Sequence, residues 1–436
     1  MTRVVVVGGG FGGLAAAARL AKLGHAVTLL EAAPALGGAL RPVEQDGFVW
    51  DASATTTLLP AVVRDLFRKS GRPLERELDL EHVEVIREHR FADRTSLRLP
   101  GGSRAAQLAA FDGLTDRRGR PQGQAWVDHV ASYGEVWELL RRHVFEARTS
   151  SPPAEVTALL RSREMLHRRL RADFADRRLR LVAGHPFEAA GHALHDVPAW
   201  AGLTAYLEQR FGAWRPAGGM AALAGVLADR MTTRRVEVHT STVVDDLVVR
   251  SGRAVAVRTR AGEIDADAVV VAIDPRRLAT LAPYAARTTP AIPPAIVHLG
   301  LNGDVPALPG ELVLHGDPTL VVRPGGTAPD GGHAWTVLVR GRLQEDVLLA
   351  LARHRVDVRQ QVATRLDLSP RDLVERWRGS PLGVAWRGRS TARLGPTTPV
   401  PGVYAAGAHA VAGDGLPFVG LSAALVAQSL GPSVTR

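Results

Sequence analysis

The sequence of 436 residues contains no cysteine, which excludes disulfide bonds, thiolate metal ligands and cysteine nucleophiles. Lysine is almost as rare: Lys22 and Lys69 are the only two, so the net charge of +10 comes almost entirely from arginine. No uncharged apolar run reaches the ~18 residues that a membrane-spanning helix needs. We therefore expect a cytoplasmic protein that is soluble or lies against the inner face of the membrane.

Other features that carry chemistry are also missing. The 15 histidines show no paired spacing along a helix with a third ligand, which predicts that there is no metal site. Aromatic residues make up only 5% of the chain and no nucleic-acid recognition motif is evident, so we expect no nucleic-acid partner despite the positive charge. Hydrophobic residues make up 46%, which predicts an ordered chain, and the length favours two domains.

The first forty residues carry the strongest pattern. Four β-branched residues, Val4–Val7, predict a strand that is buried on both faces. A G-x-G-x-x-G turn follows at Gly8, Gly10 and Gly13, which respectively permit a tight turn, a close approach of pyrophosphate and close packing of the next helix. That helix is expected from about Phe11 to Leu23, and its free N–H groups suit a phosphate.

A second strand, Ala26–Leu30, ends in Glu31, about twenty residues after the turn. An acid there accepts hydrogen bonds from a ribose 2′-OH and disfavours a 2′-phosphate, which predicts that NADP does not bind here. The pair Gly37-Gly38 comes next, and a nicotinamide-binding unit does not need it.

The spacing from Glu31 to the glycine pair resembles the FAD-binding start of the flavin amine oxidase and phytoene desaturase superfamily. In that superfamily the pair brings a second backbone segment against the FAD pyrophosphate, and an arginine usually follows directly. Here the sequence continues Ala39-Leu40-Arg41, so the basic contact is missing or has moved to Arg41.

Three later segments narrow the resemblance to phytoene desaturases: Gly47–Pro60, the W-x-P-x-G-G-M pattern of Trp214–Met220, and Gly407–Pro417, whose spacing is identical. Two positions depart from the family pattern. Ser53-Ala54 replaces a Gly-Pro, and Val411-Ala412 replaces a His-Pro near the end of the chain.

The resemblance implies an α/β fold, in which a Rossmann-type, glutathione-reductase-like FAD-binding domain is interleaved with an α+β substrate domain. Residues 1–75, 214–285 and 390–436 are assigned to the FAD-binding domain, and residues 76–213 and 286–389 to the substrate-binding domain. Strands are expected at 295–301, 311–315 and 334–340, and a helix over about 344–366.

The resemblance also implies that FAD binds non-covalently, with the N-terminus of a last helix, Val419–Leu430, stabilising the reduced flavin anion. The residues that it assigns to the cofactor are Gly8, Gly10, Phe11, Gly12, Gly13, Glu31, Ala32, Gly37, Gly38, Ala39, Leu40, Arg41, Thr55, Thr56, Val243, Gly407, Ala408, Gly415, Leu416, Pro417 and Val419.

The catalytic base is left open between His409 and Asp414, with Asp51 as a third candidate. Each has a structural alternative. His409 could be a packed loop histidine, Asp414 could cap a turn beside its neighbouring glycines, and Asp51 could anchor its hairpin.

The function implied by the resemblance is an FAD-dependent dehydrogenase or desaturase that abstracts a hydride from a hydrophobic isoprenoid or carotenoid intermediate, in an elongated apolar channel. A flavin amine oxidase is the alternative, but many of these hold a water at the flavin with a lysine of the substrate domain. Here Lys22 and Lys69 both lie in the first seventy residues. A non-redox flavin-dependent isomerase is a third reading.

Residues 102–212 are expected to be mainly helical, with helical spacing over 123–147 and 153–182. Segment 153–182 reads as one unusually arginine-rich helix. It predicts either contact with an anionic membrane surface, where an apolar substrate would dissolve, or an ordinary solvated face. The oligomeric state is left open.

Overall fold

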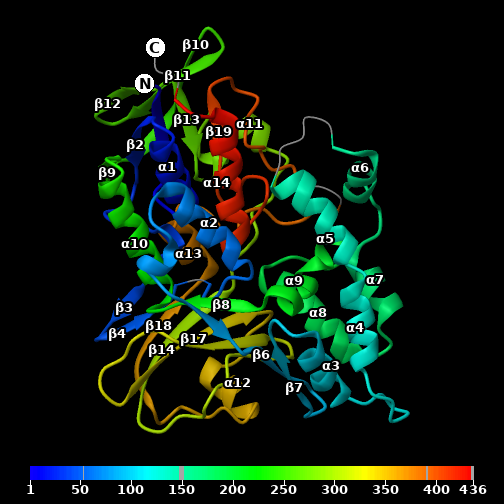
Figure 1. Cartoon of the computed structure of the whole chain (residues 1–436). Coiled ribbons are helices and arrows are strands. Elements are labelled where there is room, and N and C mark those ends of the chain that lie inside the picture. The colour runs from blue at the N-terminus through cyan, green and yellow to red at the C-terminus, as the bar shows by residue number, and fades with distance from the viewer. Residues whose placement is uncertain (53, 147–151, 389–390, 434–436) are drawn as a thin grey trace.

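A five-stranded parallel sheet forms one half of the protein (Figure 1). The computed structural model describes residues 1–52, 54–146, 152–388 and 391–433. Along the sheet the strands are β19 (Val403–Ala405), β13 (Ala268–Val271), β1 (Arg3–Val7), β2 (Ala26–Leu30) and β9 (Glu237–His239). The central strands are runs of β-branched and aliphatic residues, which suit a strand covered on both faces.

Both faces of this sheet are indeed covered. Val4 and Val6 of β1 pack into a core that includes residues of α1 (Phe11–Lys22), α2 (Pro60–Ser70), α10 (Gly219–Thr233) and α14 (Leu416–Leu430). Val5 and Val7 face the antiparallel ribbon of β10 (Val244–Arg250), β11 (Arg253–Thr259) and β12 (Gly262–Asp265). Successive strand residues point to opposite faces, so one valine run fills two cores.

A seven-stranded mixed sheet forms the second half, below the first in Figure 1. Its order is β18 (Val362–Leu368), β14 (Ala295–Asn302), β17 (Gly332–Arg340), β16 (Thr319–Pro324), β15 (Glu311–Leu314), β6 (Val85–Arg90) and β7 (Ser96–Pro100). Only β15 and β6 pair in parallel. The short helices α12 (Val347–Arg353) and α13 (Pro370–Arg376) pack on its two faces.

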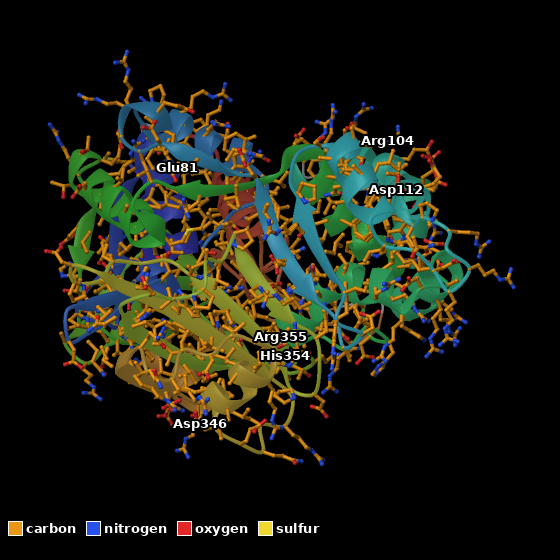
Figure 2. All side chains as sticks on the ribbon, turned by 90° about the horizontal axis from the view of Figure 1, so that it is seen from below. Glu81, Arg104, Asp112, Asp346, His354 and Arg355 are labelled. Carbon is orange, nitrogen blue, oxygen red and sulfur yellow. The ribbon has the colours of Figure 1, made fainter. Side chains whose placement is uncertain are left out.

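A helical block lies beside this sheet, on the right of Figure 1. It comprises α3 (Arg104–Asp112), α4 (Gly123–Ala131), α5 (Gly134–Leu140), a π-helical turn over Arg141–Phe145, α6 (Ala154–Leu160), α7 (Leu166–Asp173), α8 (Arg177–Ala189) and α9 (Leu203–Phe211). Figure 2, viewed from below, shows Arg104 and Asp112 of this block on the opposite side of the molecule from Asp346 at the start of α12.

Two small two-stranded pairings accompany the large sheets. β5 (Leu80–Val83) pairs with β8 (Ala213–Pro216), and β3 (Val43–Gln45) pairs with β4 (Phe48–Trp50). The chain therefore leaves the parallel sheet after α2 and returns to it through β8 and α10. This interleaving of an α/β unit with an α+β unit confirms the predicted fold class.

The strands predicted at 295–301, 311–315 and 334–340 are confirmed as β14, β15 and β17. The prediction of one helix over 344–366 is wrong. The observed helix, α12, ends at Arg353, and Val362–Leu368 forms the edge strand β18. β18 pairs with β14 along its length. Val362, Thr364 and Leu366 stand at every second position of this strand, and Arg365 and Asp367 stand at alternate positions. This period-two pattern outweighs the helical spacing that precedes it.

The single arginine-rich helix predicted over 153–182 is also wrong, because the structure divides it into α6, α7 and the start of α8. Two local interactions break it. Met165 forms a β-bridge with Pro198, and the Asp176 carboxylate accepts the N–H of Arg178 as an N-cap. Within the described residues, no helix is long and apolar enough to cross a membrane.

Candidate functional site

The glycine-rich turn joins β1 to α1 at the carboxyl edge of the parallel sheet. Gly8 has φ +102, in the left-handed region that favours glycine, and its N–H donates to Leu30 O at 2.8 Å. A Cβ on Gly13 would lie 1.8 Å from Gly8 O, so only glycine allows the helix to start this close to the strand. Leu14 N–H donates to Gly10 O, and the three helical N–H groups before it have no acceptor within the helix.

The predicted second backbone segment lies against this turn. Gly37 N–H donates to Gly9 O at 2.8 Å, and Gly37 forms a parallel bridge with Gly10. A Cβ on Gly38 would stand 2.8 Å from the Cα of Gly10. Ala39 and Leu40 then complete a 3₁₀ turn over Gly38–Leu40 and bring Arg41 to the same edge.

Glu31 lies where β2 ends, next to the turn. Its carboxylate accepts the N–H of Gly9 at 2.5 Å and the N–H of Ala33 at 2.7 Å. Ala32 lies between Glu31 and Ala33 in this turn. Its own carbonyl accepts the N–H of Thr242 at 2.8 Å, which places the next residue, Val243, at the same edge of the sheet. The residues predicted to hold the ribose and adenine are thus brought together with the phosphate turn.

The C-terminal segment closes over the start of α1. A Cβ on Gly12 would stand 2.8 Å from the Cα of Gly407 and 3.2 Å from a methyl of Val419. Gly407 N–H donates to the hydroxyl of Ser422 at 2.8 Å. Ala408 follows in this segment, and in Figure 1 α14, in red, lies beside α1, in blue.

The last helix begins earlier than predicted. It starts at Leu416 rather than Val419, with Gly415 at its N-cap and Pro417 in its first turn, a position where proline costs no hydrogen bond. Phe11 of α1 packs in the same core as Leu416 and Val419. The N-termini of α1 and α14 therefore lie in one region, and both carry partial positive charge.

The loop before α2 lines a separate cavity, to which the glycine-rich turn does not contribute. Thr55 and Thr56 line a cavity of about 480 Å³ together with Asp51 and Gly219, and Thr57 is fastened to Trp214 of β8 by two backbone hydrogen bonds. The Asp51 carboxylate accepts the N–H of Met220 at 3.2 Å, the anchoring role predicted as its alternative, and burial raises its pKa. Ser53 lies outside the described residues.

The two predicted catalytic residues have different surroundings. The side chain of His409 is 9% exposed, with Nε2 3.2 Å from Ser380 O and Nδ1 4.0 Å from Asp274, and desolvation lowers its pKa. Asp414 accepts a hydrogen bond from Arg393 at 3.2 Å and lines a large apolar cavity. Among the described residues, His409 does not contribute to the wall of that cavity.

This apolar cavity, of about 870 Å³, lies between the helical block and the C-terminal segment Val411–Phe418, which we call the closing segment. Val411–Asp414 and Phe418 line part of its wall, so it borders the N-terminal turn of α14. Its aromatic and aliphatic wall includes Leu140, Phe145, Phe187, Trp200, Leu203 and Trp386. The polar residues of the wall are Arg161, His192, Thr204, Thr391, Arg393 and Asp414.

Sequence reasoning missed several residues of this region. Trp200, Trp386 and Arg393 come from segments without a recognisable motif, and only the fold brings them to the cavity. Arg376 of α13 is another: burial lowers its pKa, and the nearby charge of Arg41 lowers it further. The two guanidinium groups are therefore near enough to repel each other.

These features fit a dinucleotide with a pyrophosphate. A Cβ on Gly10 would meet only the Cα of Gly38, at 3.9 Å, so the turn leaves room above its backbone that the protein does not fill. The free N–H groups at the N-terminus of α1 border that space, and Arg41 follows the 3₁₀ turn of Gly38–Leu40. In the described part of the chain, no group of histidine, aspartate and glutamate side chains could hold a metal ion.

Comparison with known proteins identifies the family. The sequence model of flavin-containing amine oxidoreductases matches residues 11–413. The chain is 32% identical to a zeta-carotene-forming phytoene desaturase of Myxococcus xanthus, over 62% of this chain and 53% of that enzyme. It is 28% identical to a hydroxyneurosporene desaturase of Cereibacter sphaeroides, over 98% and 97% of the two chains. The chain thus spans about half of the first relative and nearly all of the second.

Solved structures share the fold at low identity. An oxidoreductase of Methanosarcina mazei has a TM-score of 0.66 at 18% identity and covers 98% of this chain and 100% of its own. Cyclohexylamine oxidase of Brevibacterium oxydans has a TM-score of 0.63 at 15% identity, covering 98% and 99%. The predicted resemblance to desaturase-like flavoproteins is confirmed, and the family implies a flavin cofactor.

Proposed function

Because this chain belongs to the family of flavin-containing amine oxidoreductases, we propose that it binds FAD non-covalently and abstracts a hydride from a hydrophobic isoprenoid-class intermediate. The observation that carries the proposal is the apolar cavity that borders the N-terminal turn of α14. The desaturases that the chain resembles carry names of carotenoid substrates, which supports the same substrate class.

The chain's own groups would hold the cofactor as follows. The glycine turn at Gly8–Gly13 and the pair Gly37-Gly38 take the pyrophosphate, with Arg41 neutralising part of its charge. Glu31 takes the ribose. The sequence has no cysteine, so an attachment through sulfur is excluded.

When bound, FAD supplies a hydride acceptor next to the substrate carbon. The N-terminus of α14 would stabilise the negative charge that the reduced ring acquires, through the helix dipole and free N–H groups. The aromatic wall around Trp200 and Trp386 would exclude water from the reacting carbon. Asp414, in the wall of the cavity, would take the proton that leaves from the neighbouring carbon as the double bond forms.

Amine oxidation is less well supported. Lys22 lies at the C-terminal end of α1, and Lys69 lies near the C-terminal end of α2. The N-terminus of α1, where the cofactor turn lies, is the opposite end of the helix from Lys22. The solved amine oxidases match below 25% identity, so they support the fold alone.

We also propose that the exposed arginines of the divided segment, such as Arg161, Arg163, Arg168 and Arg171, give the protein a peripheral contact with anionic membranes. Sedimentation with phosphatidylglycerol vesicles at two salt concentrations tests this, because the binding should weaken as salt screens the charges.

Product analysis tests the proposed reaction. Holoprotein incubated with an acyclic polyprenoid and an electron acceptor should yield a product that has lost two hydrogen atoms, detected by mass spectrometry. The flavin should be released intact by denaturation and identified chromatographically as FAD. Conversion of an amine to an aldehyde, without conversion of any polyprenoid, would contradict the proposed substrate class.

A further inference from the structure

A second and larger cavity, of about 1280 Å³, lies on the other side of α8 from the apolar one. Its wall is rich in arginine, whereas the proposed hydride transfer uses none of these side chains. They come from three separate regions, namely Arg117 and Arg118, Arg177, Arg178 and Arg180 of α8, and Arg340 at the end of β17.

Carboxylates stand in the same wall, but few of the arginines form ion pairs with them. Arg178 is paired with Asp176 at 2.6 Å and lies 3.5 Å from Asp93, and Asp116 is paired with Arg120. In the described part of the chain, the other five arginines of the wall have no carboxylate within ion-pair distance. Asp317 and Glu188 also line the cavity, and burial raises the pKa of Glu188.

Arg340 is the most enclosed of these cations. It donates two hydrogen bonds to Ala189 O, at 2.8 and 3.0 Å, and one to Ile292 O. Burial lowers its pKa to about 10. A guanidinium carries five N–H donors, so two remain for a ligand after these three bonds. Backbone carbonyls thus hold the group rigidly without cancelling its charge.

The wall carries six arginines and five carboxylates, an excess of one positive charge. His315 lies on the wall, and its pKa is lowered to about 3, first by burial and then by the charges of His185, Arg177 and Arg87. His185 lies on the same wall and is itself buried. An anion entering the cavity would meet guanidinium groups that bind phosphates through paired, directional hydrogen bonds.

The two cavities meet at one residue. His185, Glu188 and Ala189 of α8 face the arginine cavity, and Pro186, Phe187 and Ala190 face the apolar one. His192 lines both. It lies just beyond α8, where its N–H donates to Phe187 O and its ring is buried. A chain that occupies both cavities would therefore have to pass beside the His192 ring.

We propose that the arginine cavity binds the phosphate or diphosphate head of an amphiphilic substrate whose apolar chain lies in the apolar cavity. The inference rests on the proposed function and narrows its substrate class. The head group fixes the register of the chain and so selects which carbon lies at the flavin. Binding energy from this remote end of the substrate would serve the reaction at the other end.

Calorimetric titration of the holoprotein tests the proposal with three probes: farnesyl diphosphate, farnesol and inorganic pyrophosphate. Farnesyl diphosphate should bind most tightly, because it alone fills both cavities. Arg340→Gln and Arg177→Gln should each weaken its binding by about tenfold or more, the range for a charge-assisted hydrogen bond. Neither change should alter farnesol binding by more than about twofold.

Arg171→Gln is the matched control, because it removes the same charge from an exposed position of α7 outside the cavity. Arg177 lies at the exposed rim, so its variant tests the proposal even if Arg340→Gln fails to fold. Equal affinity for farnesol and farnesyl diphosphate would overturn the proposal. So would pyrophosphate binding as tightly as farnesyl diphosphate, or Arg171→Gln having the same effect as Arg177→Gln.

These titrations require no turnover, so the two ideas can fail separately. Tight, Arg177-dependent binding of farnesyl diphosphate without flavin reduction by any polyprenoid would support the cavity assignment and contradict the proposed reaction. Polyprenoid turnover that is indifferent to the diphosphate would overturn the cavity assignment alone. Weaker sedimentation of Arg177→Gln with phosphatidylglycerol vesicles, with unchanged farnesyl diphosphate binding, would instead assign these arginines to a membrane surface.

Discussion

Gly12 and Gly407 are in backbone contact: a Cβ on Gly12 would stand 2.8 Å from the Cα of Gly407. The contact joins the first turn of the first helix to the segment that precedes the last helix. Because both segments are predicted to border the flavin, their approach sets the width of the space in which the cofactor would lie. The absence of a side chain at Gly12 is therefore a structural requirement of the closed site.

Gly12→Ala should open this contact. The added methyl group must displace the backbone of Gly407 or that of α1, and overpacking of this kind costs about 1–3 kcal/mol. We expect a lower flavin content per chain and a lower free energy of unfolding. Gly225→Ala in α10 is the control, because its Cβ would meet nothing within 4 Å. Equal flavin content in the two variants would contradict the role of this contact.

Gly10→Val separates binding from folding. Gly10 has φ −72, which any residue adopts, and a Cβ there would meet only Gly38, at 3.9 Å. The variant should therefore keep the melting temperature of the apoprotein but lose the flavin absorption, because the side chain fills the space predicted for the pyrophosphate. A folded Gly10→Val protein with full flavin occupancy would show that the cofactor does not lie on this turn.

Asp414 and His409 can be distinguished by kinetics. Asp414→Asn should slow the reduction of bound flavin by substrate at least about 100-fold, the lower range for loss of a general base. It should also reduce stability, since Arg393, with a side chain only 6% exposed, loses its charged partner. His409→Gln should affect stability more than rate, because His409 is enclosed beside Ser380. Single-turnover rates per bound flavin measure this, and the reverse pattern would make His409 the base.

Stability should fall in mild acid because of His298. Burial lowers its pKa to about 4 from the ordinary value of 6.5, so between these values the unfolded chain binds a proton that the native protein does not. The stabilisation present above pH 6.5 is lost as the pH falls towards 4, by about 2 kcal/mol between pH 7 and 5. Urea unfolding at both pH values should show a smaller difference for His298→Gln, and an unchanged one for the exposed His195→Gln.

Local patterns predicted which segments the fold brings together at the candidate cofactor site, because the steric constraints there act on the backbone. A turn such as Gly8–Gly13 has its glycines at positions that steric contact dictates, as the 1.8 Å approach of a Gly13 Cβ to Gly8 O shows. Glu31 follows at a spacing set by one helix and one strand. Each constraint lies within forty residues, so the sequence alone contains it.

The substrate half could not be predicted in this way. Trp200, Trp386 and Arg393 meet only because the helical block packs against the closing segment, and no local spacing encodes that contact. The same holds for Arg340, which the mixed sheet brings to α8. Where the sequence pattern was ambiguous, as at Val362–Leu368, pairing with a neighbouring strand decided the outcome.

The central claim, that a flavin in this protein accepts a hydride from an apolar isoprenoid, is tested most directly by anaerobic stopped-flow absorption. Purified holoprotein is mixed with a panel of polyprenoids and, separately, with a panel of amines, and the bleaching of the oxidised flavin is followed. The account predicts bleaching by at least one polyprenoid and by none of the amines. Bleaching by amines alone, or by neither panel, would contradict it.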